Sequence, residues 1–249
     1  MFDFLNVETP EYRRHSDFVD ISTNIPKRFS DLDKSIVARE FTDNIKPASI
    51  FIKDQLLSKD ECEYLVWLAE TVNEWPSSMV DFWDQRNIGL LTTIPKHMFA
   101  SVATAKLVLG IYHKTKEFLS KSFGVECYCD QMGLVRWPPG SFQMPHIDNV
   151  PNMSRFSGCV IYLNDDYEGG VTYYPFYDRQ INPSAGRIFA HDSGESHSHG
   201  VTRIFGKTRY TISSTWSTDS KDSNYDRDIQ SLTNYINECG KPERPHESS

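Results

Sequence analysis

The chain has few cysteines and no long apolar run. Its 249 residues include five cysteines, an odd number without a disulfide-scaffold pattern, which favours a reducing compartment. We expect Cys127 and Cys129 to be buried thiols that share one face of a strand. No apolar stretch approaches the roughly 18 residues of a membrane span, and the first residues lack a basic segment followed by an apolar one. We therefore expect a soluble, cytoplasmic protein without a signal peptide or a membrane partner.

The chain also has fewer basic than acidic residues. The chain has 26 Lys and Arg against 34 Asp and Glu, for a net charge of −8. Because affinity for nucleic acid depends on contacts between cations and phosphates, this balance argues against a nucleic-acid partner. The 39% hydrophobic content is ordinary for a globular protein, and the 13% aromatic content suits β-structure. A chain of this length buries enough surface to fold without a metal or a disulfide.

Helices are predicted in the first half of the chain. A short strand over 48–53 is followed by the capping box SKDE at 58–61. The helix after it has one apolar stripe, formed by Cys62, Leu65, Ala69 and Val72. Residues 74–94 have no steady period and are predicted to be a loop, in which Trp75 and Trp83 are either lid residues or core anchors. A second helix is predicted over 96–122, with Gly124 just past its end.

The pattern changes to short strands after Gly124. Turn residues such as Gly169-Gly170 separate apolar and aromatic runs, and many short strands at this spacing predict a sandwich or a barrel. Residues 1–46 are predicted to be an N-terminal arm, 47–216 a single domain, and 217–249 a polar extension with a weak helix over 226–238. The predicted strands are 125–136, 142–148, 157–163, 170–177, 186–190, 196–204 and 208–216.

A histidine and an aspartate stand two apart in MPHIDNV, residues 144–150. In a strand, His146 and Asp148 project from one face, about 7 Å apart at the backbone. A third ligand has to come from a distant segment, where His191, His197 and His199 are candidates. Two histidines and one carboxylate form a facial set that leaves three positions open on iron(II).

An arginine downstream suits a carboxylate cosubstrate. Arg209 lies ten residues after His199, just past a Gly206-Lys207 turn. Its planar guanidinium can bind a carboxylate through two parallel hydrogen bonds. Lys207 is the alternative, because a slip of register changes which side chains face inward.

These motifs together resemble the iron(II)- and 2-oxoglutarate-dependent dioxygenases, most closely the prolyl 4-hydroxylase-like branch. The resemblance covers roughly residues 48–216 and includes the helix entry IFIKDQLLSKDECEYLV. Its three motifs, in the right order and spacing, are HID at 146–148, YLNDDYEGG at 162–170 and HGVTRIFGKTRYTISSTW at 199–216.

The resemblance implies a fold and a set of cofactors. The fold is mainly β with α: a jelly-roll or cupin-like double-stranded β-helix with its core at about 125–216, supported by N-terminal helices. The cofactors are Fe(II), 2-oxoglutarate as cosubstrate and O2, with ascorbate as a further expected one.

The resemblance also assigns roles to particular residues. It makes His146, Asp148 and His199 the iron ligands, and Arg209 the group that binds the 5-carboxylate of 2-oxoglutarate. It implies that Tyr162 forms a hydrogen bond with that carboxylate. It also implies that Thr211 and Val201 line the cosubstrate pocket. His197 stays a rival of His199, while His191 is expected to face solvent or to lie behind the ligands.

The implied activity is that of a procollagen-proline-type dioxygenase, which hydroxylates a proline in a peptide or protein. Three alternatives stay open at this point. The first is a dioxygenase that acts on a free amino acid, a small metabolite or another protein side chain. The second is a non-catalytic jelly-roll binding module. The third is a zinc hydrolase, which lacks an obvious general base near the motif.

Overall fold

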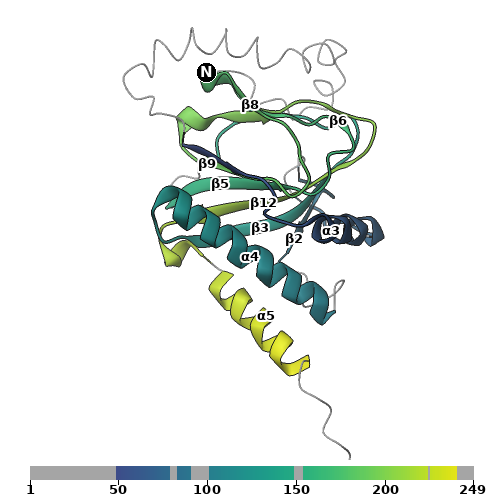
Figure 1. Cartoon of the computed structure of the whole chain (residues 1–249), viewed down its shortest axis with the longest axis vertical. Helices are drawn as coiled ribbons and strands as arrows, with labels where there is room; N and C mark the ends of the chain where they lie inside the picture. Colours follow the sequence, from purple (N-terminus) through teal and green to yellow (C-terminus); the bar gives the residue numbers. More distant parts are fainter. Residues whose placement is uncertain (1–48, 79–82, 91–100, 149–153, 224, 240–249) are drawn as a thin grey trace, which may run out of the picture.

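Antiparallel strands form two main sheets with helices on one side (Figure 1). The computed structural model describes residues 49–78, 83–90, 101–148, 154–223 and 225–239. The larger sheet has the order β1-β9-β5-β12-β3-β2. Its strands are β1 (Ile50–Lys53), β2 (Asn87–Gly89), β3 (Tyr128–Trp137), β5 (Arg155–Tyr162), β9 (Ile188–Asp192) and β12 (Arg209–Ser217).

The smaller sheet has the order β4-β10-β7-β8, and a separate pair joins β11 to β6. The two antiparallel sheets agree with the double-stranded β-helix predicted from the sequence. The strands of the smaller sheet are β4 (Gln143–His146), β7 (Thr172–Tyr174), β8 (Arg179–Ile181) and β10 (His199–Val201), and the pair consists of β6 (Glu168–Gly169) and β11 (Ile204–Phe205).

In the part of the chain that the structure describes, three helices support the larger sheet. Helix α3 (Lys59–Thr71) begins with the predicted capping box, in which Ser58 accepts from the Glu61 backbone and Glu61 accepts from the Ser58 backbone. Helix α4 (Val102–Phe123) ends at Gly124, whose φ of 69° is the left-handed conformation that glycine adopts without strain. Figure 1 shows α4 running across β5, β12 and β3, with α5 (Tyr225–Cys239) beyond it.

Strand β12 divides its side chains between the helices and the sheet opposite. Ile212 and Trp216 belong to the main apolar core, and Trp216 stacks on Tyr112 of α4 at 5.6 Å between ring centroids. The alternate residues, among them Arg209 and Thr211, line a cavity instead. The two-residue period of a strand therefore sends the apolar half of β12 to the helices and the polar half to the site.

Cys127 and Cys129 are buried free thiols, as predicted. The prediction that they share a strand face was wrong, because β3 begins at Tyr128 and Cys127 precedes it. The predicted C-terminal helix is also present, as α5, and it contacts α4 and β3. The boundary at residue 216 stays a prediction. The N-terminal arm, residues 1–46, lies outside the described residues.

Several predicted elements were wrong in detail. The stretch 74–94 was predicted to be a loop, but it contains β2, which pairs with β3. Because β2 has only three residues, it shows no period of its own. The strand predicted over 170–177 ends at Tyr174, and a separate β8 follows that was not predicted.

Two further corrections concern the site. The strand predicted over 142–148 ends at His146, so Asp148 lies beyond its end. The strand predicted over 196–204 is interrupted, because β10 covers only His199–Val201 and His197 ends a 3-10 turn over Glu195–His197. His197 and His199 therefore do not share a strand face.

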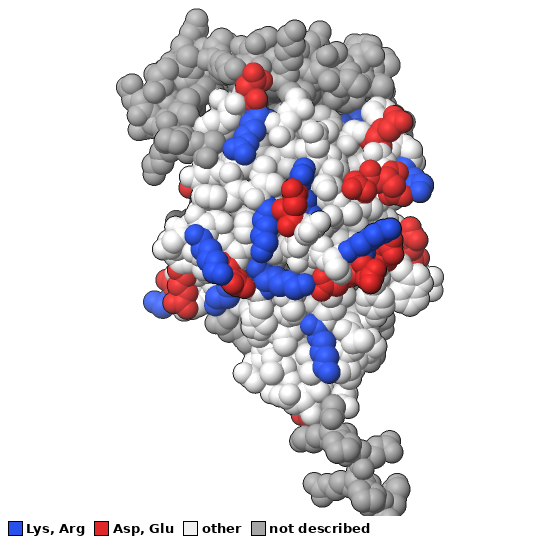
Figure 2. Space-filling view, viewed as in Figure 1, with Lys and Arg blue, Asp and Glu red and all other residues white. Residues whose placement is uncertain are grey.

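Charges of both signs are mixed on the face drawn in Figure 2, where basic and acidic side chains lie side by side. The ion pairs Lys114–Glu61 and Lys121–Glu117 are examples on α3 and α4. Among the helices that the structure describes, none combines the length and the apolar character that crossing a membrane requires.

Candidate metal centre

A cavity of about 600 Å³ opens between the two main sheets. Strands β4 and β10 of the smaller sheet and β12 and β3 of the larger sheet contribute its walls. It contains His146, Asp148 and His199 as well as Arg209. The structure therefore brings the predicted metal ligands and the predicted cosubstrate anchor into the lining of one cavity.

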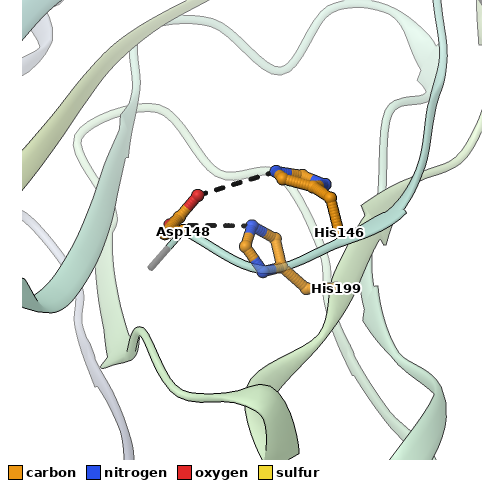
Figure 3. Close-up of side chains that lie close together, drawn as sticks. All are labelled: His146, Asp148 and His199. Carbon is orange, nitrogen blue, oxygen red and sulfur yellow. Dashed lines mark ion pairs between the residues drawn. The ribbon is translucent and has the colours of Figure 1, made fainter. Parts of the chain in front are cut away.

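Strand pairing brings the two predicted ligand histidines together. His199, the first residue of β10, lies opposite His146, the last residue of β4. Their ring centroids are 4.4 Å apart. Asp148 turns back toward both rings just after β4 ends (Figure 3). Its Oδ1 lies 3.6 Å from His146 Nε2, and its Oδ2 lies 4.0 Å from His199 Nε2.

Backbone carbonyls orient both rings. His146 Nδ1 lies 3.0 Å from the Met144 carbonyl oxygen, and His199 Nδ1 lies 3.1 Å from the His197 carbonyl oxygen. When Nδ1–H donates to a carbonyl, Nε2 keeps its lone pair, which is how ligand histidines are commonly held. One ligand atom from each of His146, Asp148 and His199 lies within 4.8 Å of the other two.

The electrostatics of the cluster suit a cation. Burial lowers the pKa of His199 well below its usual value, so its ring stays neutral and able to bind metal. Burial tends to raise the pKa of Asp148, but the neighbouring histidines and Arg155 outweigh it and hold that pKa below its usual value. The donor set of two neutral imidazoles and one carboxylate fits iron(II). Its role as the metal-binding set stays a prediction.

Arg209 is a buried residue of the cavity lining. The side chain is 1% exposed and stacks on Trp137, with 4.7 Å from Cζ to the ring centroid, and on Tyr162, with 5.2 Å. Its Nε and Nη1 have no hydrogen-bond partner among the described residues. A buried guanidinium with unpaired donors fits an anionic ligand, because leaving such groups unpaired is costly.

Lys207, the alternative anchor, points elsewhere. It lies in the turn before β12, with 71% of its side chain exposed, and its Nζ contacts Asp166 Oδ2 at 2.7 Å. It is absent from the cavity wall. The placement therefore favours Arg209 over Lys207.

The three other residues predicted for the cosubstrate pocket lie near Arg209. Thr211 and Val201 line the cavity, and Thr211 Oγ1 accepts a hydrogen bond from Trp137 Nε1 at 3.2 Å. The Tyr162 hydroxyl lies 3.0 Å from Thr172 Oγ1 and 3.3 Å from the Ile181 carbonyl oxygen. Tyr162 thus supports Arg209 with its ring, while its predicted bond to the cosubstrate stays a prediction.

The two rival histidines have different positions. His197 Nε2 accepts a hydrogen bond from the Ser49 backbone N–H at 3.1 Å, so its ligand atom is occupied. His191 is 1% exposed, and its Nε2 lies 3.5 Å from Asp148 Oδ2. Of the two positions expected for His191, facing solvent was wrong, and lying behind the ligands agrees with its contact with Asp148. The reason is that β9 lies inside the larger sheet and turns this side chain toward the metal centre.

The backbone of Asp148 is held by an arginine of an ion pair that the sequence did not indicate. Arg155 Nη1 donates to the Asp148 carbonyl oxygen at 2.9 Å. The same guanidinium pairs with Asp130 of β3, and both side chains are nearly buried. Thr215 Oγ1 also donates to Asp130, at 3.1 Å. Arg155 therefore fixes the backbone that presents the predicted carboxylate ligand.

Gly158 of β5 makes room for that carboxylate. A Cβ atom at this position would lie 1.9 Å from Asp148 Oδ2 and 3.2 Å from His191 Cε1. A glycine within an apolar strand often marks such a close approach. The glycine in the apolar stretch FSGCVIY, residues 156–162, is therefore the sequence signal of this close approach.

We expect Gly158→Ala to damage the centre more than the fold. The added methyl displaces the Asp148 carboxylate, which can rotate away, so metal affinity should fall by about 10- to 100-fold while the protein stays folded. Titration with Co(II) in a calorimeter, together with a thermal melt, measures both effects.

Gly110→Ala is the matched control. A Cβ at Gly110 meets nothing within 4 Å, and alanine favours a helix, so this variant should bind metal like the wild type and be slightly more stable. Equal metal affinities in the two variants would contradict the role given to Gly158.

Comparisons with known proteins agree with this geometry. The model of the 2OG-Fe(II) oxygenase superfamily matches residues 132–217. This segment contains the three predicted ligands and Arg209, and we identify it as a domain of that superfamily. The enzyme class predicted from the sequence, a 2-oxoglutarate-dependent dioxygenase, is confirmed; the family uses Fe(II), 2-oxoglutarate and O2. No curated protein sequence matches the chain.

Solved structures of prolyl hydroxylases share the fold. The viral collagen prolyl hydroxylase of Paramecium Bursaria Chlorella virus-1, in its 2OG complex, matches with 16% identity and a TM-score of 0.53, over 69% of this chain and 97% of that one. The Trichoplax adhaerens prolyl hydroxylase, in complex with a peptide fragment of the hypoxia inducible factor oxygen degradation domain, matches with 15% identity and a TM-score of 0.51, over 79% and 93%. A 2OG-Fe(II) oxygenase family oxidoreductase from Burkholderia pseudomallei matches with 16% identity and a TM-score of 0.50, over 76% and 91%.

Proposed function

We propose that this protein hydroxylates a proline residue in a peptide or protein, with Fe(II) and 2-oxoglutarate. One observation supports the chemistry above all others: His146, Asp148 and His199 converge in the same cavity as Arg209. That arginine is buried, and its Nε and Nη1 have no hydrogen-bond partner among the described residues. A non-catalytic binding module does not require a cluster of metal-ligand residues beside a buried arginine. A zinc hydrolase does not require the buried guanidinium.

Each part of the site has a task in this proposal. His146, Asp148 and His199 hold the iron, which together with 2-oxoglutarate and O2 supplies the oxidising chemistry that hydroxylates a C–H bond. Arg209 binds the distal carboxylate of 2-oxoglutarate and thereby sets the direction in which the cosubstrate enters. The aromatic rings of Trp137 and Tyr162 keep water from the guanidinium, which strengthens its attraction for the carboxylate.

The presence of the Asp148 carboxylate favours hydroxylation over halogenation of the substrate. The resemblance implies that a small residue at this position, as in halogenating members of the family, would leave room for a halide. Because Asp148 is present and lies 3.6 Å from His146 Nε2, hydroxylation is the outcome that we propose.

Apolar groups at the rim of the cavity support a prolyl substrate. Ile147, between two of the predicted ligands, is 40% exposed and lines the cavity. Trp83 also lines it and stands edge-on to Trp137 at 6.4 Å between ring centroids. An exposed aliphatic group and an indole suit a pyrrolidine ring. Among proteins that share the fold, the Trichoplax adhaerens enzyme was solved with a peptide.

The test uses the iron-loaded full chain, 2-oxoglutarate and a set of proline-containing peptides. Mass spectrometry should detect the gain of one oxygen atom on proline, accompanied by an equal amount of succinate. The same peptides with alanine in place of proline serve as controls. Succinate formed with free amino acids or small metabolites but with none of the peptides would instead support the alternative substrate class. Adding ascorbate tests the further cofactor that the resemblance implies, which should prolong turnover.

A further inference from the structure

A carboxamide lies on the cavity face of the larger sheet. Asn87 of β2 is exposed and lines the cavity that also contains the predicted metal ligands. A Cβ atom at Gly133 of β3 would lie 2.0 Å from Asn87 Oδ1 and 3.2 Å from Asn87 Nδ2. The carboxamide therefore covers Gly133, and the missing side chain at that position makes room for it.

Strand register gives the distance of this carboxamide from the metal centre. Gly158 of β5, which makes room for the Asp148 carboxylate, pairs with Thr215 of β12. Two residues earlier on β12, Ser213 pairs with Gly133. Strands lie about 4.8 Å apart and two residues span about 7 Å, so Gly133 lies about 12 Å from Gly158. An extended chain covers that distance with about three to four residues.

The sheet surface beside the carboxamide carries only small side chains. Gly89 of β2 pairs with Gly133, and Gly133 pairs with Ser213. All three residues line the cavity. Glycine within a strand often marks a site where a ligand or another backbone approaches closely. This part of the cavity therefore has room for the main chain of a substrate.

The Asn87 carboxamide has the groups that a peptide group requires. It carries two N–H donors and one carbonyl acceptor, and the structure gives it no hydrogen bond to another described residue. A peptide group has one N–H donor and one carbonyl acceptor. One carboxamide can therefore bind one peptide group through two hydrogen bonds, without any charge on either side.

We propose that Asn87 is a specificity-determining residue, which binds a peptide group of the substrate about three to four residues from the reacting proline. The inference rests on the proposed function and deepens it, because it assigns a substrate contact within the same cavity. A free amino acid at the metal centre is too short to reach Asn87. The contact therefore selects peptides over free amino acids.

Asn87→Leu tests the contact, since leucine keeps the approximate size of the side chain and removes its hydrogen-bonding groups. The assay uses the iron-loaded full chain and proline-containing peptides that the wild type hydroxylates. The KM for the peptide should rise about tenfold, while kcat, the KM for 2-oxoglutarate and the Co(II) affinity keep their wild-type values. Gly133→Ala should raise the same KM, because the added methyl displaces the carboxamide.

Asn182→Leu is the matched control. It makes the same change at an exposed asparagine that follows β8 and is not part of the cavity lining. Its KM for the peptide should equal that of the wild type.

Peptides with a single backbone ester identify the bound peptide group, because the ester has an oxygen in place of the N–H. One ester position should raise the KM of the wild type about fivefold and leave that of Asn87→Leu unchanged. An unchanged peptide KM in Asn87→Leu, or equal ester effects in both proteins at every position, would overturn the inference and leave the proposed function in place. Hydroxylation of free amino acids but of no peptide by the wild type would overturn both. If circular dichroism shows that Asn87→Leu does not fold, Gly133→Ala takes its place in the ester comparison.

Discussion

Replacing Asp148 by alanine should abolish hydroxylation and nearly abolish metal binding. Asp148 provides the one carboxylate of the cluster, and its two oxygens face His146 and His199 at 3.6 and 4.0 Å. Without it, neutral imidazoles have to hold a divalent cation with no opposite charge beside them. Since changes around a ligand already cost 10- to 100-fold in metal affinity, loss of the carboxylate itself should cost at least about 100-fold. Co(II) titration and succinate release measure the two effects.

Asp166→Ala is the control for this variant. Asp166 is an exposed aspartate whose described partners include Lys207 and Asn164, away from the cavity, so its loss should leave metal binding and turnover unchanged. Full activity of Asp148→Ala at limiting iron would refute the assignment of Asp148 as a ligand. Because Asp148 lies beyond the end of β4, both variants should keep their secondary structure by circular dichroism.

Replacing Arg209 by leucine should weaken the use of 2-oxoglutarate while leaving metal binding intact. The guanidinium is 1% exposed and has unpaired donors. Removing one partner of a buried charge pair costs about 2–5 kcal/mol, so the KM for 2-oxoglutarate should rise by at least about thirtyfold. Leucine fits among the rings of Trp137 and Tyr162, and the Co(II) affinity should match that of the wild type.

Lys207→Ala tests the alternative anchor. This lysine is exposed and paired with Asp166, so its loss should leave the KM for 2-oxoglutarate near the wild-type value. The opposite result, a large rise in Lys207→Ala and none in Arg209→Leu, would transfer the role of cosubstrate anchor to Lys207. A loss of metal binding in Arg209→Leu would mean that the variant disturbs the fold, and Arg209→Lys would then be measured in its place.

Local patterns predicted the helices and the chemistry of the site. The capping box at Ser58, the apolar stripe of α3 and the glycine after α4 depend on neighbours within four residues, which the sequence displays directly. The motif His146-Ile147-Asp148 and the segment from His199 to Arg209 likewise lie within short stretches. Residue type and spacing indicated the candidate ligands and carboxylate anchors, and the resemblance to the dioxygenase family chose among them.

Contacts between distant strands could not be predicted in the same way. Strand β2 exists because its three residues pair with β3, and its own sequence has no period. Arg155 reaches Asp130 and the Asp148 backbone only after β5 and β3 are placed in one sheet. The inward position of His191 likewise depends on which face of β9 the larger sheet turns toward β4.

The sequence by itself determined the donor types, the order of the motifs and the resemblance to a dioxygenase family, because these are properties of the chain read in order. Only the tertiary structure decided which side chains meet. Pairing of β10 with β4 joins His199 to His146 across more than fifty positions, and it leaves His197 in a turn with its Nε2 bonded to Ser49. The physical reason is that strand register sets which side of a sheet each residue faces, and that register depends on partners far away in the chain.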